Sequence, residues 1–296
     1  MGIFNGYTKP GKGVSKEDLD KTGLALYFDI FFRRFWKLIS INFMYLIASI
    51  PAIIIASFIA YYFMSVVLSL LKPEIIANGI PETYLVLMRY LIIPFTIVIL
   101  QITGSGPASV AKTYMLRKYV KDTHVWLWSD FKDSFKKNFW QGMAVYVINT
   151  LVFCALFFGF LFYRFMMTGP MSSVLSTVII ILSVIFFVMQ KYVYMLVSGF
   201  ELKIKHIYKN SAVLAIIGLK WNILSTVIIL TLMFAVGSLY SYMPAIAIAV
   251  VLAIYFSIIT FTQLFITRSV VSKYLEEPAL EQEKQKQAAS SDDDWE

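Results

Sequence analysis

Cysteine and histidine are scarce in this chain of 296 residues, which has one Cys, Cys154, and two His, His124 and His206. A single cysteine excludes an intrachain disulfide, a cysteine-rich zinc site and a CxxC redox pair. Two isolated histidines without neighbouring ligands make a poor metal site. The sequence also lacks the GxxxxGK[ST], GxGxxG, HExxH and GxSxG motifs, which carry ATP hydrolysis, dinucleotide binding, zinc proteolysis and serine hydrolysis. We therefore expect no enzymatic activity, no cofactor and no metal.

Charge is the second shortage. Charged residues make up 15% of the chain and hydrophobic residues 59%, whereas a soluble domain has about 25% charged and about 45 to 50% apolar residues. The 17% of aromatic residues suits helix ends at membrane interfaces. The net charge is +8, and the basic residues flank the apolar runs. Attraction to anionic lipid head groups therefore explains them better than binding to nucleic acid does. Membrane lipids are the expected surroundings.

Six uncharged apolar runs are long enough for a helix to cross the hydrocarbon core, which takes about 20 residues. Pro170 and Pro244 lie at short turns that join the second and third pairs of runs into hairpins. The fold class is therefore predicted to be all-α, a polytopic membrane protein with six transmembrane helices as three hairpins. The predicted spans are 38–64, 90–111, 142–163, 171–190 (with 198 as an alternative end), 221–240 and 244–267.

The distribution of basic residues predicts the orientation. Of the 26 Lys and Arg residues, all but Lys72, Arg89 and Arg164 fall on the side of the predicted membrane that holds both termini. Loops rich in Lys and Arg are retained on the cytoplasmic side of a membrane. The protein is therefore expected in a bacterial cytoplasmic membrane, with both termini on the cytoplasmic side. The spans themselves contain no Asp, Glu, Lys, Arg or His, which argues against proton coupling through a buried carboxylate.

Three segments follow from this division. Residues 1–37 form a cytoplasmic N-terminal segment with an amphipathic helix, 38–270 the six-span membrane domain, and 271–296 a charged, disordered cytoplasmic tail, since the tail has few apolar residues to bury. Amphipathic interfacial helices are also predicted around 127–139 and 201–211, the latter with a Glu201 to Lys205 pair. Their aromatic faces either lie in lipid or dock onto a partner protein. The docking candidates are Phe31, Phe35, Trp36, Phe131, Phe135 and Trp140.

Uncharged polar residues within the spans have two interpretations. Asn42, Gln101, Asn149 and Gln263 either hydrogen-bond between helices, the commoner role of such side chains, or line a polar path. The segment containing Gly104, Gly106 and Pro107 has little side-chain cover and one fewer hydrogen-bond donor. It is expected to allow close helix packing or to act as a hinge.

Four groups of short motifs stand out along the chain. They are Met1-Gly2-Ile3-Phe4-Asn5-Gly6 with Gly13-Val14, Phe35-Trp36-Lys37-Leu38 with Asn42 and Pro51, Gly106-Pro107-Ala108, and the stretch from Asp130-Phe131 to Phe135-Lys136-Lys137-Asn138. Together these motifs resemble the YesL-type membrane proteins over roughly residues 1–270. That family, from Gram-positive bacteria, has no assigned function, and its members are typically encoded beside ABC importers for oligosaccharides and beside glycoside hydrolases. The resemblance implies a role in glycan uptake and carries over no catalytic residue.

Two functions remain open from the sequence. The first is a non-enzymatic accessory subunit of a carbohydrate ABC importer that binds the permease subunits. The alternative is a stand-alone transporter or channel with an uncharged polar path. A permease subunit of the importer itself is disfavoured, because the chain lacks the cytoplasmic Glu-Ala-Ala sequence, followed by Gly, that such subunits present to their ATPase.

Overall fold

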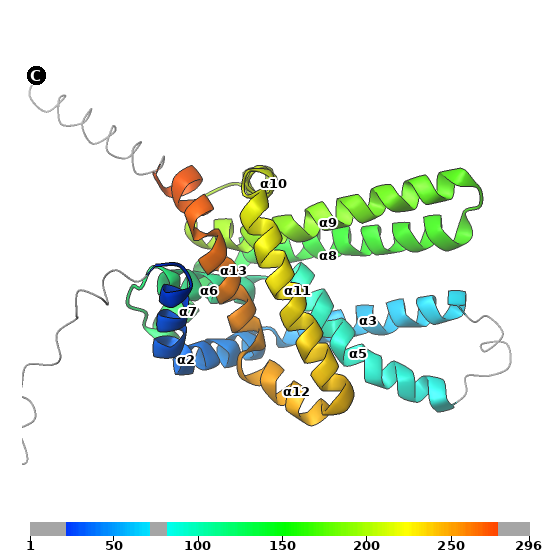
Figure 1. Cartoon of the computed structure of the whole chain (residues 1–296), viewed down its shortest axis with the longest axis horizontal. Coiled ribbons are helices and arrows are strands. Elements are labelled where there is room, and N and C mark those ends of the chain that lie inside the picture. The colour runs from blue at the N-terminus through cyan, green and yellow to red at the C-terminus, as the bar shows by residue number, and fades with distance from the viewer. Residues whose placement is uncertain (1–21, 72–81, 278–296) are drawn as a thin grey trace, which may run out of the picture. The chain divides into compact units, whose positions relative to one another are not determined.

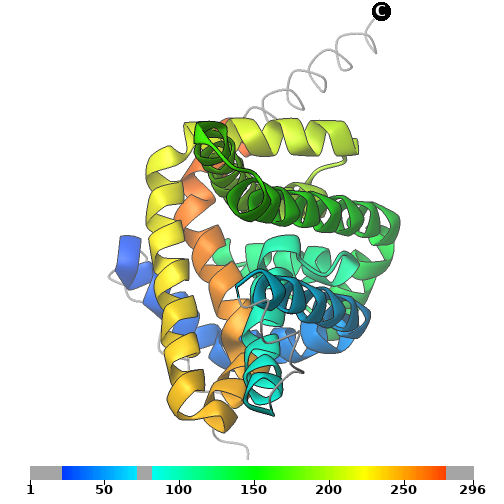
Figure 2. The ribbon, with the colours of Figure 1, turned by 90° about the vertical axis from the view of Figure 1, so that its right-hand side faces the viewer.

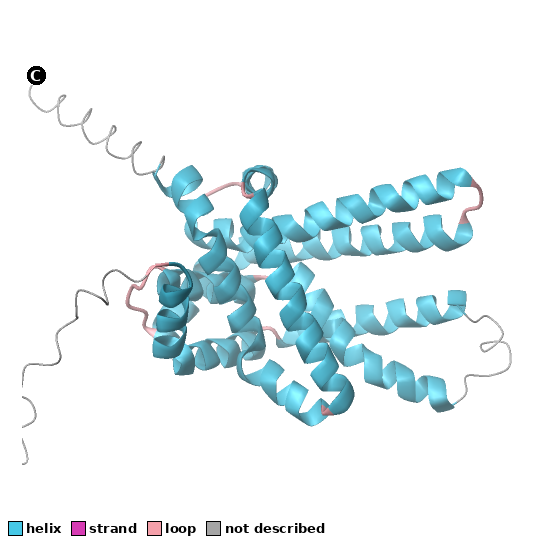
Figure 3. Cartoon of the chain, viewed as in Figure 1, coloured by secondary structure: helices cyan, strands magenta, loops and turns pink. Residues whose placement is uncertain are grey.

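The computed structural model describes residues 22–71 and 82–277. Within these two ranges the chain is helical throughout, with short connections and no strand (Figure 3). The all-α prediction is therefore confirmed. The chain divides into two units, residues 1–35 and residues 36–296, and each is described by itself.

Proline marks the start of three helices. Pro107, Pro170 and Pro244 each occupy the first turn of a helix, where the absent N–H is not needed and the fixed φ suits the helix. The helices are α2 (Gly23–Ala48), α3 (Ile50–Leu71), α5 (Glu82–Thr103), α6 (Pro107–Val120), α7 (Leu127–Lys137), α8 (Phe139–Leu161), α9 (Pro170–Gly199), α10 (Ile204–Ile217), α11 (Leu219–Tyr242), α12 (Pro244–Val250) and α13 (Phe256–Val271), with π-helical turns η1 (Phe162–Met166), η2 (Val251–Tyr255) and η3 (Ser272–Glu276).

Five helical stretches in the described part of the chain are long and apolar enough to cross a membrane. They are Ile50–Leu70, Phe139–Met166, Pro170–Gly199, Leu219–Tyr242 and Pro244–Glu276, and a sixth is formed if the bent pair Tyr90–Thr103 and Pro107–Val120 counts as one span. Exposed large apolar side chains, such as Ile181, Val184 and Phe234, cover their outward faces, as lipid contact requires. The structure thus has the helices of a multi-pass membrane protein.

The predicted spans agree with these helices to different degrees. The runs 142–163, 171–190, 221–240 and 244–267 each fall within one candidate span. The predicted span 38–64 is wrong as one helix, because α2 ends at Ala48 and α3 begins at Ile50. The span 90–111 is also wrong as drawn, because its helix ends at Thr103 and resumes at Pro107 at an angle of 70°.

The helices of unit 36–296 pack in pairs. α8 runs beside α9, α3 beside α5, and α11 beside α13 (Figures 1 and 2). Ala52, Ala56 and Ala60 form a buried row with four-residue spacing on α3, in the same apolar cluster as Ile99 and Leu100 of α5. Small residues at this spacing allow two helix backbones to approach closely in lipid.

The π-helical turn η2 is bound to α2 by one buried amide. Asn42 donates through Nδ2 to the carbonyl oxygens of Val251 (3.0 Å) and Leu252 (2.8 Å), and its Oδ1 accepts from the N–H of Ser257 at 3.1 Å. A π-helical turn interrupts the regular i to i−4 hydrogen bonds. Asn42 therefore completes the backbone hydrogen bonds of a distant helix. Of its two predicted roles, this is hydrogen bonding between helices and not the lining of a polar path.

Residues 22–35 begin α2 with rings on successive turns. Phe31 contacts Tyr27, Phe32 and Phe35, with ring centroids 6.1, 5.4 and 5.7 Å apart, and the side chains of Phe28 and Phe32 are exposed. Residues 1–21 of the predicted N-terminal segment lie outside the described residues.

The predicted tail begins too early at residue 271. α13 continues to Val271, and the π-helical turn η3 then holds the side chain of Glu276 against α6, with hydrogen bonds from Arg117 (2.6 Å) and Lys121 (2.8 Å). An ion pair with two basic partners thus orders the chain past the last apolar run. Residues 278–296 of the predicted tail lie outside the described residues.

Candidate functional site

The break between α5 and α6 is the predicted hinge. Gly104 and Gly106 both have a left-handed backbone, with φ of 76° and 63°, which other residues adopt only with strain. Residues 104–107 are buried. The chain therefore turns through a glycine-dependent bend in the interior of the protein.

Close packing surrounds this bend on two sides. A Cβ added at Gly104 would collide with the ring of Tyr194, and one added at Gly142 of α8 would lie 2.9 Å from the backbone nitrogen of Pro107. The bend is thus held by contacts that only glycine permits. Of the two predicted roles for Gly104, Gly106 and Pro107, the packing favours close helix contact.

The end of α5 is joined to α8 and α9 by a buried polar cluster. The carbonyl oxygen of Thr103, left without a helical partner at this helix end, accepts from the hydroxyl of Tyr194 (2.6 Å) and from Nδ2 of Asn149 (3.3 Å). The amides of Asn149 and Gln190 exchange two hydrogen bonds of 2.8 and 3.1 Å. Tyr208 donates to Oδ1 of Asn149 at 2.7 Å. Asn149 is therefore an interhelical junction.

The four residues predicted as a polar path are not brought together as one. Asn42 contacts η2, and Asn149 contacts Thr103, Gln190 and Tyr208. Gln263 donates to the backbone oxygen of Lys191 at 2.9 Å. Gln101 and Gln263 do share a small internal cavity, named here the Lys112 cavity, of about 50 Å³, lined by Tyr45, Gln101, Lys112, Gln190, Tyr194 and Gln263 among others.

Two lysines that the sequence interpretation placed at the cytoplasmic surface are buried instead. Lys191 lies inside α9, is 6% exposed, and donates to the backbone oxygen of Asn222 (2.8 Å) and to the hydroxyls of Ser225 (2.6 Å) and Thr226. Because α9 continues to Gly199, Lys191 lies inside a helix that is itself a candidate span, Pro170–Gly199, one residue past the predicted run 171–190. The uncharged stretch from residue 192 to residue 200 was the sequence signal that the helix continues past Lys191.

Lys112 of α6 is the second buried lysine, also 6% exposed. Its ammonium lies 3.9 Å from the centroid of the Tyr45 ring and 5.6 Å from that of Phe256. Such cation–π contacts replace part of the lost hydration of a cation. Lys112 and Lys191 both line the Lys112 cavity.

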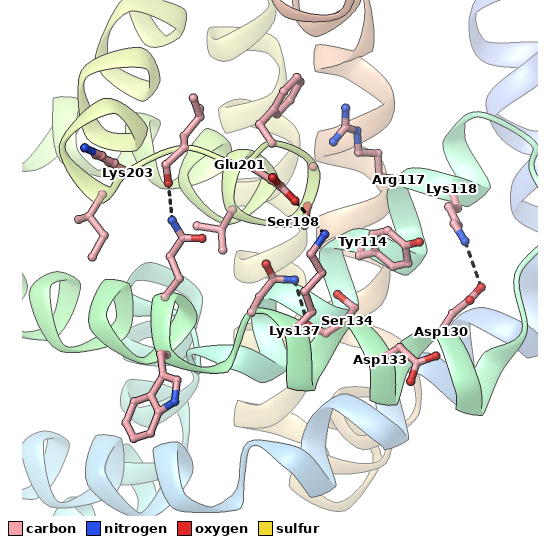
Figure 4. A pocket seen from close by; sticks show the side chains of 18 of the residues that line it. Tyr114, Arg117, Lys118, Asp130, Asp133, Ser134, Lys137, Ser198, Glu201 and Lys203 are labelled. Carbon is pink, nitrogen blue, oxygen red and sulfur yellow. Dashed lines mark hydrogen bonds and ion pairs between the residues drawn. The ribbon is translucent and has the colours of Figure 1, made fainter.

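A larger cleft of about 1270 Å³ opens among α6, α7, the start of α8 and residues 197–204 (Figure 4). Five basic and three acidic side chains line this basic cleft. Lys118 bonds to Asp130 at 3.2 Å, and Lys137 bonds to Glu201 at 3.1 Å. The charged lining residues are Arg117, Lys118, Lys121, Lys137, Lys203, Asp130, Asp133 and Glu201.

Arg117 and Glu201 each contact another residue that lines the basic cleft. The guanidinium of Arg117 lies over the Phe200 ring at 5.0 Å and leaves no space for a Cβ at Gly199. Glu201 precedes α10 and pairs with Lys137 instead of with Lys205. The predicted helical pair of Glu201 and Lys205 is therefore wrong, because α10 begins only at Ile204.

The predicted docking residues of α7 and of the first turn of α8 face in different directions. Phe131 is 5% exposed, and Phe135 is partly buried against the apolar core, so neither side chain is available for docking. Trp140 lines the basic cleft and is 81% exposed. The missed residues are on an adjoining, exposed face of α7, where Trp128, Lys132 and Lys136 follow at four-residue spacing. We name these three residues the α7 outer row.

The docking residues of the N-terminal helix are divided between the two units. Phe31 and Phe35, in residues 1–35, are partly buried within the row of rings described above. Trp36, in unit 36–296, is exposed. Within the residues that the structure describes, no group of three or more His, Cys, Asp or Glu side chains could hold a metal ion.

Comparison with known proteins gives one match. No curated protein and no solved structure matches the chain. The model of the family described as "Protein of unknown function, DUF624" matches residues 85–160, from α5 to the last turns of α8, including the glycine bend, α6 and α7. Over these residues the chain is similar to the domain of unknown function that YesL-type membrane proteins carry, which is consistent with the resemblance seen in its sequence motifs.

Proposed function

We propose that this protein is a non-enzymatic accessory subunit of a carbohydrate ABC importer, and that it binds the permease subunits. The resemblance to YesL-type proteins implies the association with oligosaccharide importers. The proposed location is the bacterial cytoplasmic membrane, with both termini in the cytoplasm, as the division of Lys and Arg indicates. The basic cleft and the α7 outer row then face the cytoplasm.

The observation that carries this proposal is how the interior polar residues are bonded. Asn42, Asn149 and Gln263 are hydrogen-bonded to other helices, and the cavity that Gln101 shares with Gln263 has only about 50 Å³. A water molecule occupies about 30 Å³ in the liquid, so a sugar ring does not fit this cavity. These contacts support a binding protein over a stand-alone transporter.

The surface that we propose for the permease combines aromatic and positive side chains. Trp128, Lys132 and Lys136 are exposed on α7, and Trp140 is exposed beside the basic cleft. Tryptophan is enriched among residues that dominate protein interfaces, and complementary charge directs the encounter. We propose that the occupant is a cytoplasmic segment of a permease subunit that carries acidic and apolar side chains.

Co-purification from the native host in mild detergent tests this proposal. Tagged wild-type protein is expected to retain a sugar permease. Trp128→Ala combined with Lys132→Ala is expected to retain roughly tenfold less or lower, because loss of an interface tryptophan commonly costs about 2 kcal/mol or more. Phe234→Ala is the matched control, since Phe234 is an equally exposed aromatic side chain on the apolar surface of α11.

Two results would contradict the accessory function. One is transport of a labelled oligosaccharide by the purified protein alone in liposomes. The other is retention of no permease by the wild-type protein. If permease is retained equally by the double variant and by the control, the α7 outer row is not the binding surface.

Cysteine labelling from either side of the membrane tests the proposed orientation separately. In a Cys154→Ala background, a cysteine at Ile80 is expected to react with an impermeant maleimide added outside. A cysteine at Ser290 is expected to react only after the membrane is opened. The reverse labelling would contradict the orientation, and the cytoplasmic assignment of the basic cleft with it.

A further inference from the structure

The Lys112 ammonium group is buried without a negative partner. Its side chain is 6% exposed, and its contacts within residues 22–71 and 82–277 are the rings of Tyr45 and Phe256. A buried ionised amine that lacks hydrogen-bonding or charged partners is strongly unfavourable. A cation–π contact offsets part of this cost, about 2 kcal/mol when the site is dry. Most of the cost of burying the charge is left without compensation by these contacts.

Lys191 provides an internal comparison. Its ammonium group, buried to the same degree, donates to three oxygen atoms, those of the Asn222 carbonyl and the Ser225 and Thr226 hydroxyls. These are the three donor directions of an ammonium group. No oxygen acceptor of this kind contacts the ammonium of Lys112 among the described residues. The two neighbouring lysines therefore differ in their hydrogen bonding, and only Lys112 has an unfilled donor capacity.

The Lys112 cavity offers space for a partner. Besides Lys112 its lining includes Tyr45, Gln101, Ser109, Thr113 and Gln263, and it contains no Asp or Glu. The amide of Gln101 and the first turns of α6 lie at the same cavity, and a helix N-terminus adds partial positive charge. The volume of about 50 Å³ corresponds to one or two water-sized particles, since water takes about 30 Å³. The cavity is thus small and positive, with the Lys112 ammonium as its donor that has no oxygen acceptor among the described residues.

We propose that the Lys112 cavity binds one small monovalent inorganic anion of the size of chloride. The anion accepts hydrogen bonds from the ammonium of Lys112 and neutralises its charge. Phosphate esters and sugars are excluded by size. Because the lining residues come from α2, α5, α6, α9 and α13, the bound anion ties five helices together at the glycine bend. Anion binding is therefore expected to stabilise the folded protein.

Thermal unfolding of the full chain in detergent tests the site. Sodium gluconate is replaced stepwise by sodium chloride at constant ionic strength. The wild-type Tm is expected to rise to a plateau, by about 2 to 4 °C for a ligand present well above its Kd. Lys112→Met is expected to remove the rise. Lys203→Met, which removes an exposed lysine of the basic cleft, is the matched control and should keep it.

Three outcomes would overturn the proposal. The first is an equal wild-type Tm in both salts. The second is a chloride-dependent rise that survives in Lys112→Met, and the third is a rise that Lys203→Met loses as well, which would indicate general charge screening. If Lys112→Met does not fold, wild-type crystals soaked in bromide provide the decision by anomalous diffraction. A bromide peak beside the Lys112 ammonium supports the site, and its absence at saturating bromide overturns it.

Discussion

Replacing Asn149 by alanine separates a structural role of this amide from a role in transport. Asn149 is fully buried and takes part in four hydrogen bonds, to the carbonyl of Thr103, to Gln190 in both directions, and from Tyr208. Gln190 has Asn149 as its hydrogen-bond partner in the described structure. The substitution therefore leaves the buried amide of Gln190 and the partly buried phenol of Tyr208 with reduced hydrogen bonding.

The expected loss of stability follows from these contacts. Hydrogen bonds between membrane helices contribute about 0.6 kcal/mol each on average and about 1.7 at most. Leaving a buried polar group unsatisfied costs about 1 to 3 kcal/mol. For four bonds and a stranded Gln190, we expect Asn149→Ala to lower the free energy of unfolding by about 2 to 4 kcal/mol. The double variant with Gln190→Ala should lose less than the two single variants added together, because the two amides bond to each other.

Reversible unfolding in mixed micelles, followed by circular dichroism, measures this loss. Ser257→Ala is the matched control, since the hydroxyl of Ser257 is buried without a hydrogen-bond partner in the described structure and its removal strands no group. We expect the control to change stability by less than about 0.5 kcal/mol, as for changes that break no interaction. A loss below that value for Asn149→Ala, or additivity with Gln190→Ala, would refute the interpretation of Asn149 as an interhelical junction.

Two further predictions concern the chain end and the bend. Truncation after Glu277 is expected to leave the free energy of unfolding within about 0.5 kcal/mol of that of the full chain. Truncation after Leu275 also removes the Glu276 ion pairs and is expected to cost about 1 to 3 kcal/mol. Equal stability of the two truncated proteins would show that the Glu276 ion pairs contribute nothing. Gly142→Ala is expected to cost roughly 1 to 3 kcal/mol from overpacking against the start of α6, measured by the same unfolding assay. Gly237→Ala, where a Cβ meets open space, should be neutral or stabilising by about 0.5 to 1 kcal/mol, and a similar loss at both glycines would argue against steric closure of the bend.

Four of the six spans could be predicted from the sequence, because lipid imposes a simple rule. A backbone in the hydrocarbon core has to satisfy its own hydrogen bonds, so a long apolar run is a helix. The spans at 142–163 and 221–240 could be predicted from this rule alone. Proline at 170 and 244 marked the turns correctly, because both residues begin helices in the structure.

The helix breaks could not be predicted in this way. Hydropathy does not register the helix break at Ser49, where the chain remains apolar on both sides. It also does not show whether the glycines near 104 bend the chain or pack it closely. In the structure they do both, since Gly104 faces Tyr194 and the chain turns there by 70°. Deciding this requires the neighbouring helix.

The direction of amphipathic faces was the other failure. The faces that carry Phe131 and Phe135 were expected either to lie in lipid or to dock onto a partner, but Phe131 is buried and Phe135 packs against the protein's own core. Periodicity identifies which residues lie together on a helix and not what covers them. Lys191 was misplaced for a related reason, because its three oxygen partners lie on α11, about 30 residues further along the chain.

The amide of Asn42 also has a consequence for the order in which the protein is made. Its partner carbonyl on Val251 lies 209 residues further along the chain, so α2 leaves the ribosome long before η2 exists. Until the last helices are synthesised, Asn42 has to find a temporary partner, because a polar group in hydrocarbon is costly. The bundle can close only after translation reaches residue 257, whose N–H completes the set. A chain that stops before that point leaves Asn42 without these three partners, whereas a chain that continues past α13 can close α2 onto η2 and α13.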